Sequence, residues 1–126
     1  MRATLEYAGI RVKDLEASVR FYTKVLGMIE RGRKHLGETR GVLVELIGEG
    51  GGVPLELNWY ERGSTFDTPY VPGEGLDHLG FRVSDLERAV AEAQKAGYPV
   101  IQEIKTATNR WVYIQDPNGI WVELNG

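Results

Sequence analysis

The chain of 126 residues contains no cysteine, which excludes a disulfide framework, a thiolate nucleophile and a thiolate zinc site. No apolar run approaches the ~20 residues that a membrane span needs, and the N-terminus lacks the apolar core of a signal peptide. Basic residues number 15 against 18 acidic ones, so the basic excess typical of nucleic-acid-binding proteins is missing. These absences predict a small cytoplasmic protein with no nucleic-acid partner and no membrane partner.

An internal repeat organises the chain. Residues 9–19 read GIRVKDLEASV and residues 80–90 read GFRVSDLERAV, with seven of eleven positions identical at an offset of 71. A second match, at an offset of 67, pairs LELN at 55–58 with VELN at 122–125. The repeat predicts one domain over 1–126, with a first module over 1–60, a linker over 61–76 and a second module over 77–126.

Hydrophobic periodicity gives each copy the order βαβββ, which predicts an α+β fold. Asp14 and Asp85 are expected to cap the two helices, and Gly27 and Gly97 to end them. His35 is expected in a solvated loop, and a tight turn at 116–119. The predicted strands cover 5–12, 28–34, 41–47 and 54–60 in the first copy, and 77–83, 99–104, 110–115 and 120–125 in the second.

Alternation along the first and last strand of each copy separates an apolar face from a polar one. The polar faces display four side chains at matched positions of the repeat: Tyr7, Glu56, His78 and Glu123. One imidazole and two carboxylates suit a borderline divalent metal such as Zn²⁺, Ni²⁺, Co²⁺, Mn²⁺ or Fe²⁺. A polar sheet face is usually only solvated, but glutamate is disfavoured inside strands, and its recurrence at equivalent positions favours a site.

The motif V-x-D-L-x-x-x-[VA] after the first strand, the DP-[ND]-G turn and the closing [VI]-E-L strand resemble the vicinal oxygen chelate superfamily over the whole chain. Within it, the segments LELNWY, LDHLGFRV, YIQDPNGIWVELN and FYTKVLGM look most like glyoxalase I, the lactoylglutathione lyases. The resemblance implies two βαβββ modules that form a concave mixed sheet, and a homodimer.

The resemblance also implies a divalent metal ion held by two histidines and two glutamates. Three of these positions hold Glu56, His78 and Glu123, whereas the first histidine is replaced by Tyr7. A neutral phenol is a poor ligand because its pKa near 10 must first be lowered. Three alternatives stay open: a three-ligand site with water, a phenolate that favours oxidised iron, or no metal, as in the antibiotic-sequestering members.

The activity implied is that of a lyase or isomerase acting on the hemithioacetal of an α-ketoaldehyde and a thiol such as glutathione. Glu123 is the expected general base, and Glu56 the candidate for the opposite stereoisomer. The expected substrate contacts are Arg11, Arg82, Trp111 and Tyr113. The alternatives are a non-catalytic protein that binds a small molecule of the antibiotic type, and another metal-dependent enzyme of the superfamily, an epimerase or a dioxygenase.

Overall fold

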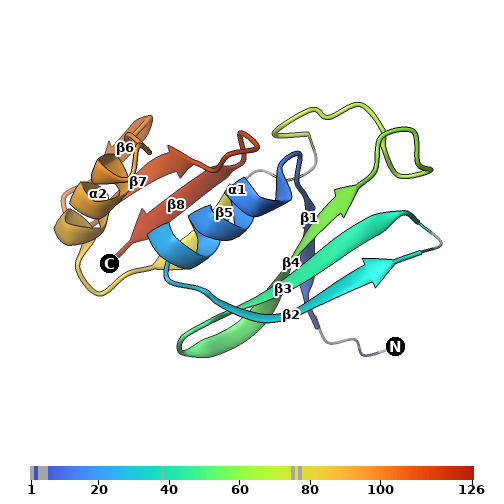
Figure 1. Ribbon diagram of the computed structural model, residues 1–126. Helices are drawn as coiled ribbons and strands as arrows, with labels where there is room; N and C mark the ends of the chain where they lie inside the picture. Colours follow the sequence, from blue (N-terminus) through green and yellow to red (C-terminus); the bar gives the residue numbers. More distant parts are fainter. Residues whose placement is uncertain (1, 3–5, 38, 75, 77) are drawn as a thin grey trace. The chain divides into compact units, whose positions relative to one another are not determined.

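The computed structural model describes residues 2, 6–37, 39–74, 76 and 78–126. The chain divides into two compact units, Met1–Tyr70 and Val71–Gly126, and each is built on one four-stranded mixed sheet (Figure 1). No helix in these described ranges is long and apolar enough to cross a membrane.

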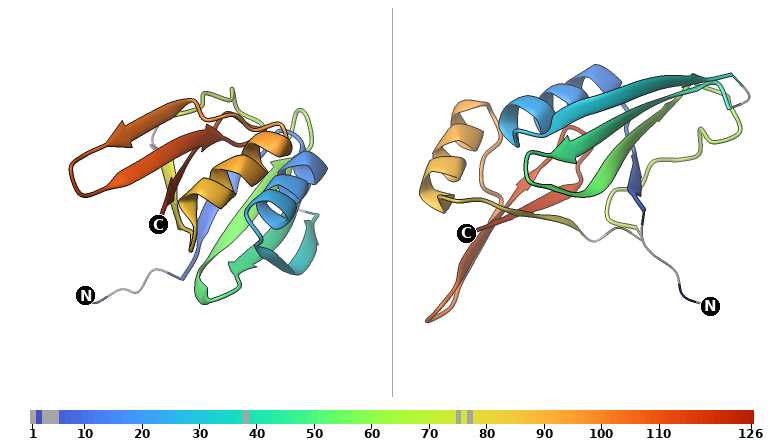
Figure 2. Two further views of the ribbon diagram at one scale, coloured as in Figure 1. Left: turned by 90° about the vertical axis from the view of Figure 1, so that its left-hand side faces the viewer. Right: turned by 90° about the horizontal axis from the view of Figure 1, so that it is seen from below.

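The first unit has the strand order β1-β4-β3-β2, in which β1 is parallel to β4 and the other pairs are antiparallel. Figure 2 shows β2, β3 and β4 running side by side as a meander, and α1 packs against β4. Its elements are β1 (Ala8–Arg11), α1 (Leu15–Arg20), the π-helical turn η1 (Phe21–Val25), β2 (Ile29–Leu36), β3 (Gly41–Gly48) and β4 (Gly51–Tyr60).

The second unit repeats this topology as β5-β8-β7-β6, with β5 parallel to β8 and α2 packed against β8. The predicted α+β class and the doubled βαβββ order are therefore confirmed. Its elements are β5 (His78–Arg82), α2 (Leu86–Lys95), β6 (Gln102–Lys105), β7 (Arg110–Gln115) and β8 (Trp121–Asn125).

The repeat extends to the register of the strands. Gly9 of β1 lies opposite Glu56 of β4, and Gly80 of β5 lies opposite Glu123 of β8. The backbone N–H groups that follow β1 and β5, those of Val12 and Val83, donate to the last asparagine carbonyl of each repeat at 2.9 and 2.7 Å. The offset of 71 in the sequence therefore relates β1 to β5, and the offset of 67 relates β4 to β8.

The predicted caps are present. The Oδ1 atom of Asp14 accepts a hydrogen bond from the N–H of Ala17, and that of Asp85 accepts from Arg88, both at 3.0 Å. Each aspartate thus satisfies a backbone donor that the first helical turn leaves without a partner. Gly27 and Gly97 follow the two helices with φ of 70° and 93°, the left-handed conformation that glycine adopts without strain.

The turn at 116–119 is also confirmed, and a buried carboxylate builds it. Oδ1 of Asp116 accepts from the backbone N–H groups of Asn118 and Ile120, both at 2.8 Å, and Oδ2 accepts from the Asn118 side-chain amide at 2.7 Å. Asp116 and Asn118 are both buried. The turn is thus held by side-chain hydrogen bonds as well as by the φ of 86° at Gly119.

Several predicted boundaries were wrong. The first helix is not one α-helix, because its second half forms the π-helical turn η1, which brings the adjacent side chains of Phe21 and Tyr22 into the core together. Strand β2 extends to Leu36, so His35 lies in a strand and not in a loop. Strand β4 starts at Gly51, three residues earlier than predicted, and β6 is confined to 102–105.

The core of each unit consists of the apolar strand faces and the side chains that its helix contributes. Leu57 of β4 and Val122 of β8 are completely buried. The opposite faces carry the polar side chains singled out by the sequence. The main core side chains are Ile10, Val19, Phe21, Tyr22, Val44, Leu46, Leu55 and Leu57 in the first unit, and Val90, Ala93, Val112, Ile114, Val122 and Leu124 in the second.

Candidate functional site

The polar face of the second sheet carries a hydrogen-bonded cluster centred on Glu123. His78 opens β5 and places its Nε2 atom 3.4 Å from Oε2 of Glu123. The hydroxyl of Tyr113, on the neighbouring strand β7, donates to the same oxygen at 2.8 Å. Asn125 donates its side-chain N–H to Oε1 at 2.9 Å. Both carboxylate oxygens are therefore engaged within this unit.

Aromatic rings surround this carboxylate. The ring of Tyr113 lies edge-on to the imidazole of His78 and is tilted against the indole of Trp121, with centroid separations of 5.5 Å in both cases. The indole N–H of Trp111 donates to the Tyr113 hydroxyl at 3.2 Å. Trp121 remains 40% exposed, so the cluster offers an aromatic surface beside its polar groups.

The first unit surrounds its equivalent glutamate differently. Glu56 lies directly opposite Glu45 of β3. Burial raises the pKa of Glu56 above its usual range, and the negative charge of Glu45 adds to the rise, while Lys34 opposes it. Glu45 itself is hydrogen-bonded to Arg31 at 2.7 Å, which lowers the pKa of Glu45.

Tyr7 comes one residue before β1 and is 50% exposed. The offset of the repeat makes it the equivalent of His78. The remaining predicted ligands are divided between the units, with Glu56 in the first, and His78 and Glu123 in the second. Over the ranges that the structure describes, no group of three or more histidine, aspartate or glutamate side chains gathers to hold a metal ion.

Within the described second unit, His78 and Glu123 lie close together, and their donor chemistry fits a metal ion. Zinc and its neighbours in the first transition row accept an imidazole nitrogen together with carboxylate oxygens. His78 and Glu123 supply one of each, from adjacent strands and on one sheet face. A carboxylate held by further hydrogen bonds is the usual companion of such ligands.

The two arginines predicted to contact substrate have different surroundings. The guanidinium of Arg11 donates to the hydroxyl and the carbonyl of Thr68 at 2.8 and 2.6 Å. Thr68 lies in the part of the predicted linker that belongs to the first unit. Tyr70 donates its hydroxyl to the Arg11 carbonyl at 3.2 Å, and its ring lies 5.2 Å from the guanidinium carbon. Arg82 is exposed on β5, an edge strand.

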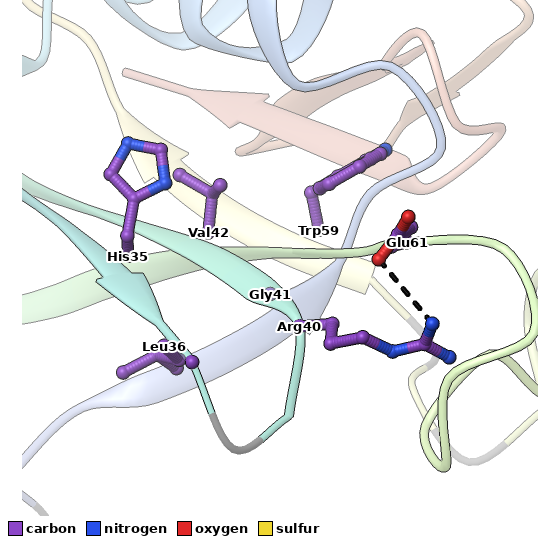
Figure 3. A pocket seen from close by; sticks show the side chains of 8 residues that line it. His35, Leu36, Arg40, Gly41, Val42, Trp59 and Glu61 are labelled. Carbon is purple, nitrogen blue, oxygen red and sulfur yellow. Dashed lines mark ion pairs between the residues drawn. The ribbon is translucent and has the colours of Figure 1, made fainter.

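A pocket of about 350 Å³ lies elsewhere in the first unit. Figure 3 shows His35, Val42 and Trp59 on one side of the sheet, with the ion pair of Arg40 and Glu61 nearby. His35, Val42 and Trp59 occupy strand positions that alternate with that of Glu56, so these side chains point away from it. None of the predicted site residues lines it; the lining residues are His35, Leu36, Gly37, Arg40, Gly41, Val42, Trp59 and Glu61.

The predicted site residues did not include two members of the cluster, Asn125 and Trp121, and Tyr113 was assigned only to substrate. The recurrence of E-x-N in LELN and VELN was the available signal for Asn125, because residues two apart on a strand share a face. In the first copy, Asn58 donates instead to the backbone carbonyl of Glu56 at 3.4 Å. The motif repeats, but its hydrogen bond to the carboxylate is present only in the second unit.

Comparison with known proteins decides the family. The model of the Glyoxalase/Bleomycin resistance protein/Dioxygenase superfamily matches residues 4–124. The chain belongs to this superfamily. Among its members, the chain is 31% identical to the uncharacterized protein YwbC of Bacillus subtilis, with 98% of each chain covered. It is 30% identical to a lactoylglutathione lyase of Pseudomonas aeruginosa, over 91% of this chain and 77% of that one.

Solved structures of the superfamily share the fold. The trypanothione-dependent glyoxalase I of Leishmania major superposes with a TM-score of 0.78 at 27% identity, over 99% of this chain and 87% of that one. TnmS3, an antibiotic binding protein from a Streptomyces species, gives a TM-score of 0.74 at 21% identity, over 98% and 95%. Enzymes and binding proteins of the superfamily thus share this fold, so function must be argued from the site.

Proposed function

We propose that the protein is a metal-dependent lyase of the glyoxalase I type, acting on the hemithioacetal of an α-ketoaldehyde and a thiol such as glutathione. The observation that carries the proposal is the pairing of His78 with Glu123, at positions where the resemblance implies metal ligands, with Tyr113 and Asn125 holding the carboxylate. The lactoylglutathione lyases among the relatives support the same class of reaction.

The proposed metal ligands are Glu56, His78 and Glu123, with Tyr7 as a fourth candidate. A bound Ni²⁺, Zn²⁺, Co²⁺, Mn²⁺ or Fe²⁺ ion would supply Lewis-acid polarisation of two neighbouring substrate oxygens, which acidifies the adjacent C–H bond. Three protein ligands leave a position open for substrate, as in catalytic zinc sites. Tyr7 would complete the set only as a phenolate.

In the proposed reaction, a carboxylate oxygen of Glu123 removes the proton from the carbon that bears the thioether. The same oxygen returns the proton to the neighbouring carbon, and the hydroxyl proton passes to the former carbonyl oxygen, which converts the hemithioacetal into a 2-hydroxy thioester without net oxidation. Glu56 would serve the substrate of opposite configuration. Its raised pKa suits a proton acceptor, because a base works best when its pKa approaches the operating pH.

Substrate contacts are proposed for Trp111, Tyr113, Arg82 and Arg11. Arg82 is the stronger candidate of the two arginines for an anionic group on the thiol, because Thr68 already engages the guanidinium of Arg11. The two units are proposed to act as a single domain within a homodimer, which light scattering would test through the mass of the particle. We place the protein in the cytoplasm, where the thiol co-substrate stays reduced.

The deciding experiment measures metal content per chain by mass spectrometry after purification without an affinity tag. The expected result is near one equivalent per chain, lost in His78→Ala. Each metal-loaded form is then assayed for S-lactoylthiol formation from methylglyoxal and glutathione. Absence of metal after incubation with all five ions, or absence of activity with every one of them, would overturn the proposal.

A second candidate is a binding protein without chemistry. The exposed indole of Trp121, beside the ring of Tyr113, is the observation that favours it, because exposed aromatic surface suits a planar ligand. Quenching of tryptophan fluorescence by a small molecule, in a protein that turns over no hemithioacetal, would establish it. An epimerase or dioxygenase would instead show turnover of another vicinal-oxygen substrate by the metal-loaded protein.

A further inference from the structure

The hydroxyl of Tyr113 lies between a donor and an acceptor. The indole N–H of Trp111 donates to it at 3.2 Å, and it lies 2.8 Å from Oε2 of Glu123. An indole nitrogen can only donate, and an ionised carboxylate can only accept. The hydroxyl proton therefore points at Glu123, and the hydrogen bonds run in one direction, from Trp111 through Tyr113 to the carboxylate.

This arrangement fixes the orientation of the Glu123 side chain. Tyr113 donates to one carboxylate oxygen and Asn125 to the other, so rotation of the carboxylate would break both hydrogen bonds. The oxygen that Tyr113 holds is also the one that lies 3.4 Å from Nε2 of His78. The side chain of Glu123 is only 18% exposed, so water does not readily replace these donors.

The ring of Tyr113 is fixed independently of its hydroxyl. It contacts His78 edge-on and packs against Trp121. In the first unit, the residue across from the equivalent glutamate is Glu45, which has no proton to donate when it is ionised. The hydroxyl is therefore not required by the fold, since the same backbone register forms without it.

We propose that Tyr113 is a positioning residue, which turns the carboxylate of Glu123 toward His78 so that both present their donor atoms together. Its meaning for catalysis rests on the proposed lyase function, whereas the orientation itself is a property of the second unit. Hydrogen bonds to a ligating carboxylate typically change metal affinity by 10–100-fold. The role goes beyond a substrate contact, because it acts through Glu123.

Tyr113→Phe tests the proposal, because it removes the hydroxyl and retains the ring contacts. Tyr60→Phe, the same substitution outside the Glu123 cluster, is the control. In crystal structures of the metal-free proteins, we expect the Glu123 carboxylate to leave its contact with His78 in Tyr113→Phe only. We also expect the dissociation constants of Ni²⁺ and Zn²⁺, measured by calorimetry, to rise about tenfold in that variant. In the loaded enzyme, kcat should fall more than KM rises, because the variant retains the ring that is proposed to contact the substrate.

Trp111→Phe provides a second variant, since it removes the donor to Tyr113 but leaves the hydroxyl. It should shift metal affinity in the same direction and by less. An unchanged Glu123 conformation together with unchanged metal affinity in Tyr113→Phe would overturn the positioning role, even if the enzyme proves to be a lyase. If the wild-type protein binds neither ion, the lyase proposal fails, and the crystal structures still decide the role of Tyr113.

Discussion

Glu56 and Glu123 occupy the same place in two copies of one unit, yet their surroundings are opposite. Each lies on a central strand across from a glycine of the parallel edge strand. On the other side, Glu56 faces the carboxylate of Glu45, whereas Glu123 faces the hydroxyl of Tyr113. The repeated backbone places both carboxylates on the polar faces. The residue on the neighbouring strand then determines whether the carboxylate meets a second negative charge or a hydrogen-bond donor.

The two units therefore present different chemical groups at equivalent positions of the repeat. The second unit presents an oriented carboxylate beside an imidazole. The first presents Tyr7, one residue before β1, in place of the imidazole, and a glutamate whose pKa is raised by burial.

The largest effect is expected at Glu123. Glu123→Gln should lower kcat of the metal-loaded protein by about 10²–10³-fold, because an amide cannot accept the proton that a general base removes. Glu56→Gln should have a smaller effect on the mixed hemithioacetal. Metal content is measured in both variants, so that loss of a base is separated from loss of a ligand. A larger loss in Glu56→Gln would reverse the proposed roles.

The next largest effect is expected on stability, in the turns that precede the last strand of each unit, β4 and β8. Asp116→Ala removes the acceptor of three buried hydrogen bonds and should destabilise the protein by about 3 kcal/mol, since each orphaned buried donor costs ~1–3 kcal/mol. Urea denaturation measures the change. Asp116→Asn, which keeps one acceptor oxygen, should lose less, and Glu49→Ala in the exposed turn of the first unit should change stability by less than about 0.5 kcal/mol.

Much of the difference between the surroundings of Glu56 and Glu123 could not be predicted from the sequence. The repeat, the caps at Asp14 and Asp85 and the alternating faces follow from local patterns, and they are correct because their causes are local. The pairing of Glu45 with Glu56 depends on the β3–β4 register, which shifts between Leu46 and Gly48. A one-residue shift exchanges the two faces, so counting along the chain cannot establish which residues meet.

The cluster around Glu123 could be predicted only in part. Alternation places His78 and Glu123 on polar faces, but the bond from Tyr113 depends on the side-chain rotamers of two strands. The π-helical turn was missed for a similar reason, because the burial of both Phe21 and Tyr22 comes from tertiary packing and overrides the helical period. Arg11 was predicted to contact substrate because Thr68, which accepts hydrogen bonds from its guanidinium, lies 57 positions away in the chain and the sequence does not show this contact.

Tyr7→His would remove the difference between the first strands of the two units. It gives the first unit the imidazole that His78 gives the second, and should tighten Ni²⁺ and Zn²⁺ binding by about tenfold or more, since even outer-shell partners are worth 10–100-fold. Calorimetric titration measures the change. Tyr7→Phe is the control: unchanged affinity would show that the phenol is not a ligand, whereas weaker binding of oxidised iron would support a phenolate.

The smallest effect concerns the pair of glutamates in the first unit. Glu45→Gln removes the neighbouring charge and should lower the pKa of Glu56, without restoring the usual value, because burial is the larger cause of the rise. Titration of the Glu56 carboxyl carbon by NMR measures the shift. Arg31→Gln leaves Glu45 without its partner at 2.7 Å and supplies the control, in which the pKa of Glu56 should not fall.

The sign of the accompanying stability change follows from proton binding. A carboxyl whose pKa is raised by folding binds its proton more tightly in the folded state, so its protonation stabilises the fold below the unfolded pKa. That contribution is lost as the pH rises through the raised pKa of Glu56. In Glu45→Gln, this contribution to folding stability should be lost over a narrower pH range. An unchanged pH range would mean that burial alone determines the proton affinity of Glu56.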